Sequence, residues 1–248
     1  MERKKRNIVV VLIAAIIAVA VLSSFGLGLF APDTAEIVLP SAGPSQTPGG
    51  EGDAVRVEVA PETVQSVIAT LARPESYGRT VTIQDFWEDE ELGTTTAQVW
   101  VDRGWTRTDA VWPGGTLRSS IVGDGQFWVW YGGGDEVLTG PADGSSADLE
   151  GQRIPTYETV LELEASSITA AGYQALDGLG CIYVETDTGE GHAARFWVDD
   201  DSGLLVRAEQ LTGGQVVYRM TAAALERPAP SNASFTLPDG TVLHQIDL

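Results

Sequence analysis

Few side chains in this sequence could carry out catalytic chemistry. One cysteine, Cys181, and two histidines, His192 and His244, are the candidates for a thiol nucleophile or an imidazole base. The chain has no G-x-S-x-G, H-E-x-x-H or C-x-x-C motif and no glycine loop suited to cradling a phosphate. Both histidines are expected at the surface, and Cys181 is expected as a small packed side chain on a strand. The sequence therefore predicts a protein that is not an enzyme and uses no cofactor.

Clustered carboxylates suggest metal binding at one place only. Residues 199–203, Asp-Asp-Asp-Ser-Gly, resemble a calcium loop, because hard cations prefer carboxylate oxygens. The loop lacks the full spacing and the distal bidentate glutamate, so a turn between two strands is the simpler interpretation. Residues 88–91, Glu-Asp-Glu-Glu, are likewise expected to form a solvated hairpin loop. No metal site is predicted.

The strongest functional signal is apolar surface on alternating strand positions. In residues 126–131, Phe127, Val129 and Tyr131 point to one side and Trp128 and Trp130 to the other. Similar alternation on other strands predicts a set of inward side chains that lines an apolar ligand cavity. The alternative is that the same side chains form only a core. The predicted ligand-binding residues are Val99, Val101, Phe127, Val129, Tyr131, Ile182, Val184, Tyr218 and Met220.

Tryptophans mark the opposite side of the same strands. If Val99 and Val101 face inward, Trp100 faces outward, and Trp128 and Trp130 join it. An exposed aromatic patch often marks a surface for a partner or a membrane interface. The alternative is that these rings form cross-strand pairs that cover their own sheet. Trp100, Trp128 and Trp130 are therefore the predicted partner-binding residues.

The charge balance excludes one class of partner. The chain has 15 basic and 35 acidic residues and a formal net charge of −20, and four of the basic residues lie between Arg3 and Arg6. A protein with this negative charge is repelled by the phosphate backbone of DNA or RNA, which excludes nucleic-acid binding.

The N-terminus predicts the compartment. Residues 8–31 are almost entirely apolar and long enough to cross a bilayer, and the basic tail at residues 1–7 is expected to stay in the cytoplasm. A cleaved signal peptide is the alternative, but small residues suited to cleavage are poorly placed. Residues 32–53 contain four prolines and predict a flexible linker. We expect a single-pass anchor in the cell membrane, with the domain at residues 54–248 outside the cytoplasm.

The periodicity of this domain predicts α+β architecture. Apolar spacing between Pro61 and Pro74 predicts a helix, and residues 156–165 suggest a second. Period-two alternation predicts two runs of strands separated by turns, including an Asp124-Gly125 hairpin. Such runs, with the helices segregated, indicate one large antiparallel sheet. The predicted strands cover residues 80–84, 94–101, 104–112, 117–122, 126–131, 180–186, 193–198, 204–211 and 216–222.

The order of these elements resembles the LolA-like family. The resemblance rests on a strand–turn–strand signature in residues 196–199 and 203–209, and on the segments 214–218 and 235–240. It covers about residues 55–246. It implies a curved half-barrel sheet, with helices on the concave side and an apolar cavity that holds acyl chains.

The family resemblance also implies two functions for the cell envelope of a bacterium. The first is lipid or lipoprotein binding without catalysis, with a lipid or acylated protein as partner. A soluble carrier must leave the membrane, and an anchored chain does not, so a tethered lipid-binding protein is expected here. The alternative is an envelope-stress sensor that binds a membrane protein through the tryptophan face.

Overall fold

The computed structural model describes residues 58–142, 153–231 and 233–246. The chain divides into two units, Met1–Asp53 and Ala54–Leu248, and the description below concerns the second. The basic tail, the anchor at residues 8–31 and the linker fall outside the described residues, so these three assignments stay predictions. Among the residues that are described, no helix is both long and apolar enough to cross a membrane.

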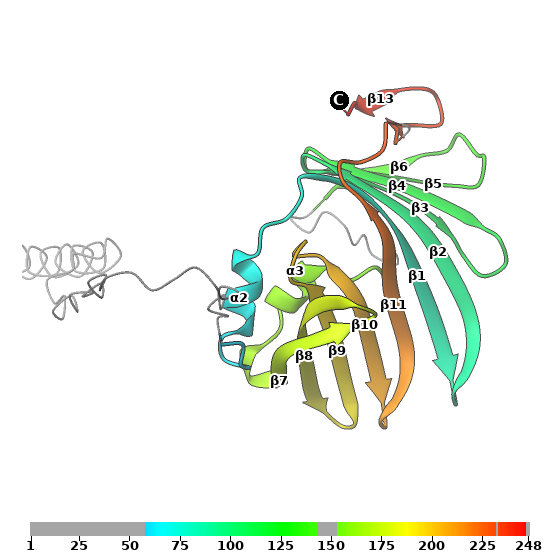
Figure 1. Cartoon of the computed structure of the whole chain (residues 1–248). Coiled ribbons are helices and arrows are strands. Elements are labelled where there is room, and N and C mark those ends of the chain that lie inside the picture. The colour runs from blue at the N-terminus through cyan, green and yellow to red at the C-terminus, as the bar shows by residue number, and fades with distance from the viewer. Residues whose placement is uncertain (1–57, 143–152, 232, 247–248) are drawn as a thin grey trace, which may run out of the picture. The chain divides into compact units, whose positions relative to one another are not determined.

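Antiparallel strands make up most of this unit (Figure 1). They are β1 (Ser76–Trp87), β2 (Glu90–Asp102), β3 (Trp105–Val111), β4 (Leu117–Gly123), β5 (Gln126–Tyr131), β6 (Leu138–Pro141), β7 (Ile168–Leu176), β8 (Leu179–Gly189), β9 (His192–Asp199), β10 (Leu205–Thr212), β11 (Gln215–Glu226), β12 (Phe235–Thr236) and β13 (Val242–His244). The main sheet has 11 strands in the order β6-β5-β4-β3-β2-β1-β11-β10-β9-β8-β7. Two runs of hairpin-connected strands therefore meet in the middle, where β1 pairs with β11.

Short turns connect neighbouring strands because their residues tolerate positive φ angles. Asp124 and Gly125 have φ values of 49° and 70° and lie between the paired residues Gly123 and Gln126. Two successive positive φ angles match the right-handed twist of a hairpin. The predicted Asp124-Gly125 hairpin is confirmed, and Glu88 and Asp89 form the turn between β1 and β2 in the same way.

Both predicted helices are present but short. They are α2 (Val64–Thr70) and α3 (Tyr157–Leu161), and a 3₁₀ turn (Ala165–Ser167) follows α3. Thr156 caps α3, because its hydroxyl accepts a hydrogen bond from the backbone N–H of Glu158 at 3.2 Å. The helix ends at Leu161, several residues earlier than the sequence pattern suggested.

Two strands at the edges of the sheet, β6 and β7, are not among the strands predicted from the sequence. β7 contains Ala170, Ala171 and Gly172, which have low strand propensity. Its pairing with β8 over the whole length, from Ile168 opposite Thr186 to Leu176 opposite Leu179, makes this segment a strand.

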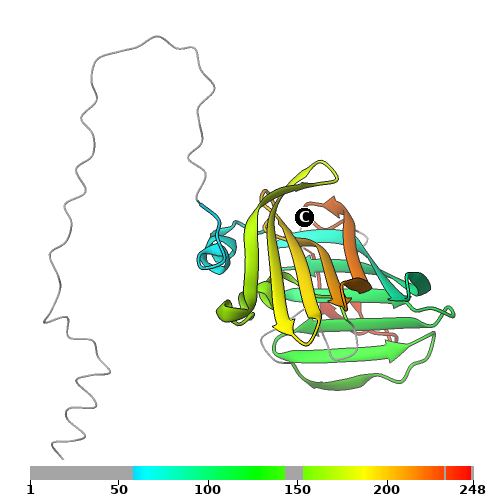
Figure 2. The same cartoon turned by 90° about the horizontal axis from the view of Figure 1, so that it is seen from below.

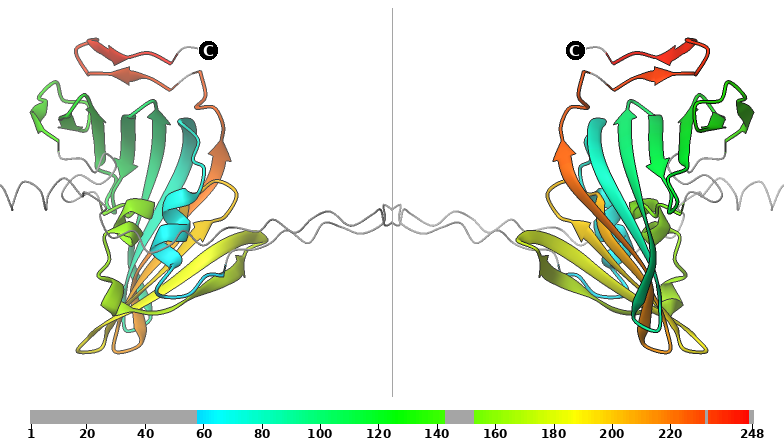
Figure 3. Two further views of the ribbon diagram at one scale, coloured as in Figure 1. Left: turned by 90° about the vertical axis from the view of Figure 1, so that its left-hand side faces the viewer. Right: turned by 90° about the vertical axis from the view of Figure 1, so that its right-hand side faces the viewer.

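The sheet is strongly curved, and α2 and α3 lie within its curvature (Figure 3). Seen from below, strands of the green half run in a clearly different direction from those of the yellow half, as expected for accumulated twist (Figure 2). The helices cover one face of the sheet, and the small hairpin of β12 and β13 packs on the other. The predicted class, α+β with one curved antiparallel sheet and few helices, is confirmed for this unit.

Candidate functional site

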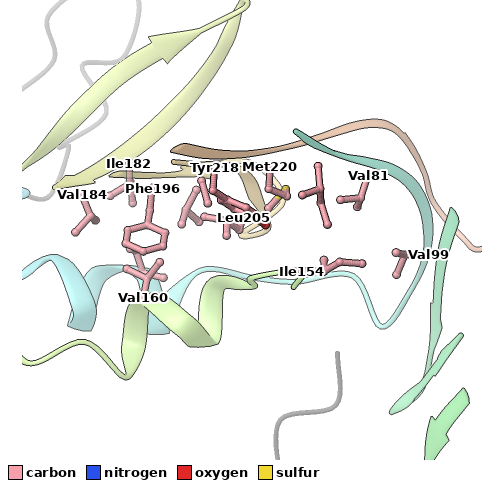
Figure 4. Close-up of a cluster of buried hydrophobic side chains, with 14 of the residues drawn as sticks. Val81, Val99, Ile154, Val160, Ile182, Val184, Phe196, Leu205, Tyr218 and Met220 are labelled. Atoms are coloured by element: carbon pink, nitrogen blue, oxygen red, sulfur yellow. The ribbon is translucent and has the colours of Figure 1, made fainter. Parts of the chain in front are cut away.

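The face beneath the helices collects most of the predicted ligand-binding residues. Val99 on β2, Ile182 and Val184 on β8, and Tyr218 and Met220 on β11 belong to one apolar cluster. Figure 4 shows this cluster between the strands on one side and the two helices on the other, with Val160 of α3 directed at the sheet. We call this cluster the apolar interior; it comprises Val64, Ile68, Val81, Ile83, Ala97, Val99, Ala110, Ile154, Val160, Ile168, Ile182, Val184, Phe196, Val198, Leu205, Ala208, Tyr218 and Met220.

The apolar interior is filled by its own side chains. Val99 is 2% exposed, Tyr218 is 3% exposed, and Ile182, Val184 and Met220 are fully buried. Each such side chain contributes about 1.5–3 kcal/mol by leaving water. These residues therefore form a closed core in this structure.

Three of the predicted ligand-binding residues lie elsewhere. Phe127, Val129 and Tyr131 are on β5, close to the edge of the sheet, and none belongs to the apolar interior. Val129 is 6% exposed, whereas Tyr131 is 45% exposed and makes an edge-on contact with Trp112 at 5.9 Å. The alternation placed these side chains correctly on one face, but the structure does not bring all nine predicted residues to one site.

A small cavity opens at the border of the apolar interior. Its volume is about 130 Å³, and Val101 and Leu205 line it together with polar groups. Val101 is thus the one predicted ligand-binding residue among those that line it. We call it the Arg73–Arg79 pocket; its lining residues are Arg73, Pro74, Tyr77, Arg79, Val101, Thr106, Thr156, Tyr157, Glu158, Leu204 and Leu205.

Two arginines give this pocket its charge. Arg73 donates to the carbonyl oxygens of Ile68, Leu71 and Gly203, and its guanidinium lies 3.6 Å from the centroid of the Tyr157 ring. It therefore joins the end of α2 to the turn before β10.

The second arginine, Arg79, donates from Nη1 to the carbonyl oxygen of Leu205 at 2.9 Å. Burial raises the pKa of the neighbouring Tyr77; Arg79 opposes this increase and Glu158 adds to it. The Tyr77 hydroxyl is therefore neutral at physiological pH and available as a hydrogen-bond donor in the pocket.

Sequence reasoning missed these arginines, although a signal was available. Val81 and Ile83 on β1 belong to the apolar interior, and the alternation of a strand places Arg79 and Tyr77 on the same side. An arginine at an inward position of a central strand is unusual enough to mark a site. Arg73 had no comparable signal, because it lies between α2 and β1.

The tryptophan face is covered by the chain's own C-terminal residues. Trp100, Trp128 and Trp130 do share the outward face, as predicted, and Trp130 is 6% exposed. The expectation of an exposed aromatic patch is wrong, since β12, β13 and the flanking residues pack on it. The residues from the C-terminal segment are Phe235, Leu237, Leu243 and Ile246.

His244 helps to hold this segment in place. Its Nε2 lies 2.7 Å from Oδ2 of the buried Asp102, and its ring stacks on Trp105 at 5.4 Å. The Trp105 ring in turn lies flat against Gly123, where a Cβ atom would come within 2.1 Å of it. His244 was expected at the surface, but its side chain is only 17% exposed, whereas His192 is exposed at the start of β9.

No family model matches this chain, and neither does any curated protein. Several solved structures are similar in fold. A LolA superfamily protein from Nitrosomonas europaea is 12% identical over 67% of this chain and 93% of its own, with a TM-score of 0.32. The match to the MucA/MucB complex of Pseudomonas aeruginosa has 16% sequence identity, covers 68% of this chain and 56% of that chain, and has a TM-score of 0.41. The match to an uncharacterized conserved protein from Thermus thermophilus has 12% sequence identity, covers 63% of this chain and 81% of that chain, and has a TM-score of 0.41.

The architecture fits a LolA-like fold. A curved antiparallel sheet with short helices inside its curvature is what the resemblance of the sequence implied. At identities of 12–16% and TM-scores of 0.32–0.41, these neighbours do not indicate what this chain binds. This chain also spans only 56% of the MucB-containing chain it matches.

The cysteine and the aspartate cluster that the sequence analysis considered are part of the local structure before β10 and on β8. Cys181 is buried, and burial, followed by Asp199 and Asp200, raises the pKa of its thiol to about 11. Asp199 accepts hydrogen bonds from the backbone N–H and hydroxyl of Ser202, which closes the turn before β10. Within the described residues no group of three or more His, Cys, Asp or Glu side chains could hold a metal ion.

Proposed function

We propose that this protein is a membrane-anchored extracytoplasmic protein that binds a lipid or an acylated molecule without transforming it. The observation that carries the proposal is the apolar interior beneath α2 and α3. It extends across β1–β3 and β7–β11, and the two helices that cover it have only seven and five residues.

Few polar bonds fasten these helices to each other or to the sheet. Nε2 of Gln65 donates to the carbonyl oxygens of Val160, Leu161 and Leu163, and so links α2 to α3. Arg73 fastens the end of α2 near β10. Most of the remaining contact is apolar, and an acyl chain replaces apolar contacts at about 0.8 kcal/mol per buried methylene. Ligand binding therefore exchanges one apolar contact for another as the helices separate from the sheet.

The location in the proposal rests on the N-terminal sequence. The apolar residues 8–31 and the preceding basic tail support a single-pass anchor with the domain outside the cytoplasm. The acidic exterior keeps the domain away from anionic lipid surfaces, so a lipid would reach the interior one molecule at a time.

Photo-crosslinking with a fatty acid that carries a diazirine on its chain tests this function. The full chain, held in an amphipathic polymer, is labelled, digested and mapped by mass spectrometry. We expect saturable labelling of peptides that contain Val99, Val184 and Met220, suppressed by excess unlabelled fatty acid. Labelling confined to the tryptophan face, or no saturable labelling, would overturn the proposal.

A matched pair of variants strengthens this test. Ala208→Met adds bulk to the apolar interior, where Ala208 is 2% exposed, whereas Ala175→Met adds the same atoms at an exposed position of β7. We expect the first variant to lower labelling several-fold and the second to leave it unchanged. Because the interior is already filled, Ala208→Met also lowers the melting temperature, and labelling is compared well below both unfolding midpoints. Equal labelling of both variants would contradict a ligand in the apolar interior.

A further inference from the structure

Arg79 is a buried cation without an anion. The residue is 4% exposed, and none of the described carboxylates pairs with it. Its Nη1 donates to the Leu205 carbonyl oxygen, but its buried Nε has no hydrogen-bond partner. A guanidinium has five N–H donors, and burying its charge unpaired is costly. The arrangement is therefore complete only when an acceptor with negative charge occupies the adjoining space.

The Arg73–Arg79 pocket is the space that this guanidinium lines. Arg73 adds a second positive charge, since its hydrogen bonds go to carbonyl oxygens and no carboxylate among the described residues pairs with it. Glu158 is the carboxylate in the lining, and its two oxygens accept from Thr156 Oγ1 at 3.2 Å and Tyr157 Oη at 3.4 Å. Two cations therefore face one carboxylate, in a chain whose net charge is −20.

The pocket also borders the apolar interior. Leu205 belongs to both, and Val101 lines the pocket while packing against the apolar interior. A ligand seated here thus meets charged donors on one side and buried hydrocarbon on the other. This pairing of surroundings suits an amphiphile with a small anionic head.

A second cavity next to Arg79 is less suited to an anion. It has a volume of about 300 Å³ and is lined by Arg79 and Arg227 together with Asp199 and Asp201. Arg227 is already paired with Asp201 at 3.0 Å. The lining of this second cavity has two arginines and two aspartates, so its charges balance. The excess of positive charge is in the lining of the Arg73–Arg79 pocket.

We propose that the Arg73–Arg79 pocket binds the oxyanion head, a carboxylate or a phosphate, of the acyl ligand whose chain enters the apolar interior. The inference rests on the proposed function and specifies its ligand class. Arg79, whose Nε–H has no hydrogen-bond partner, donates to the head group, and Tyr77 lies in the same lining. The chain of the ligand runs past Val101 and Leu205 beneath the helices.

Equilibrium dialysis of the full chain in an amphipathic polymer tests the head-group preference. Dodecanoate, dodecyl phosphate and dodecanol share one chain length and differ in the head, while acetate and inorganic phosphate supply the head alone. We expect both anionic amphiphiles to bind at least about tenfold more tightly than dodecanol. Acetate and inorganic phosphate should not compete at the same concentrations.

Two arginine variants identify the residue responsible. Arg79→Met keeps the length of the side chain and removes its charge, and Arg207→Met removes an equal charge from an arginine that is paired with Asp177 at 3.0 Å. We expect Arg79→Met to abolish the preference for anionic heads while dodecanol binding stays within about twofold. Arg207→Met should retain the preference, and Arg79→Lys should retain part of it.

The possible outcomes separate the two proposals. Equal binding of dodecanoate and dodecanol by the wild-type chain, or a preference that survives Arg79→Met, overturns the head-group site but leaves lipid binding intact. If inorganic phosphate displaces dodecyl phosphate at the same concentration, the pocket binds free anions without an acyl chain. This result also overturns the inference. If no amphiphile binds, the proposed function itself fails. The comparison of dodecanoate with dodecanol uses the wild-type chain alone. It therefore tests the inference even if Arg79→Met folds poorly.

Discussion

Buried polar side chains give this protein its most specific contacts at the scale of single residues. Asp102 is 2% exposed and is held by His244 from the C-terminal segment. Burial raises the pKa of Asp102, but hydrogen bonds from Ser76 and His244 outweigh it, so the pKa of this carboxyl lies below its usual range. The contact ties the end of β2 to a residue 142 positions away in the sequence.

The lowered pKa of Asp102 predicts a component of acid sensitivity. The ionised carboxylate contributes its full stabilisation above the unfolded pKa, about 4, and loses it as the pH falls through the folded value. We expect Asp102→Asn to flatten the decline in the free energy of unfolding between pH 5 and pH 3, as measured by urea denaturation. Asp124→Asn, in an exposed turn, serves as the control and should keep the wild-type slope. Identical slopes for wild type and Asp102→Asn would contradict this role.

At the scale of elements, two short pieces of chain each cover one face of the sheet. The helices cover the inner face, and the segment with β12 and β13 covers the tryptophans. Phe235 is 1% exposed and contacts His244 edge-on at 5.1 Å. Without this segment the outer face would present the aromatic patch that the sequence predicted.

Removing the Phe235 ring should weaken the packing of the C-terminal segment on the sheet. We expect Phe235→Ala to lower the free energy of unfolding by about 3–5 kcal/mol, because it leaves a cavity against Trp130 and Ile121. Quenching of tryptophan fluorescence by acrylamide should increase at the same time. Leu92→Ala is the control, since Leu92 is 68% exposed, and its effect should stay within about 0.5 kcal/mol. A comparable loss in both variants would show that Phe235 does not hold the segment.

Gln65 is predicted to control how firmly α3 is attached to α2. Gln65→Ala removes three hydrogen bonds to carbonyl oxygens near the end of α3. We expect a loss of about 1–3 kcal/mol and faster amide exchange in residues 157–163. Gln126→Ala, at an exposed position, should change neither measurement. Unchanged exchange in α3 would mean that apolar contacts alone fix this helix.

At the scale of the whole described unit, one pairing joins the two halves of the sheet. β1 pairs with β2 along one edge and with β11 along the other, so Thr82 lies between Thr96 and Thr221. The apolar interior draws side chains from both halves. We infer that the sheet unfolds as one cooperative structure.

Proline scanning tests this cooperativity. Thr82→Pro removes a backbone donor in the centre of the sheet, and we expect it to cost more than about 3 kcal/mol and to broaden or split the unfolding transition. Thr139→Pro lies on the edge strand β6, which has one neighbouring strand, and should cost less. The inference fails if Thr82→Pro unfolds in a single transition at the wild-type midpoint.

Local sequence determined most of the strands and their turns. Alternation and the Asp124-Gly125 pair fix which residues share a face, because side chains in a strand have a period of two. The same rule placed Val99, Ile182 and Met220 together before any contact was known. It failed for β7, whose alanines carry little strand signal and depend on β8.

Only the tertiary structure decided what covers each face. Alternation separates Trp100 from Val99, but it does not say that residues 235–246 fold back over the tryptophans or that Arg79 is buried without a carboxylate. Both depend on contacts between residues more than 100 positions apart, such as Arg79 with Leu205 and Asp102 with His244. A period of two is a property of each strand alone, whereas burial depends on which distant segment the chain brings onto that face, and the free energy of those contacts is not encoded locally.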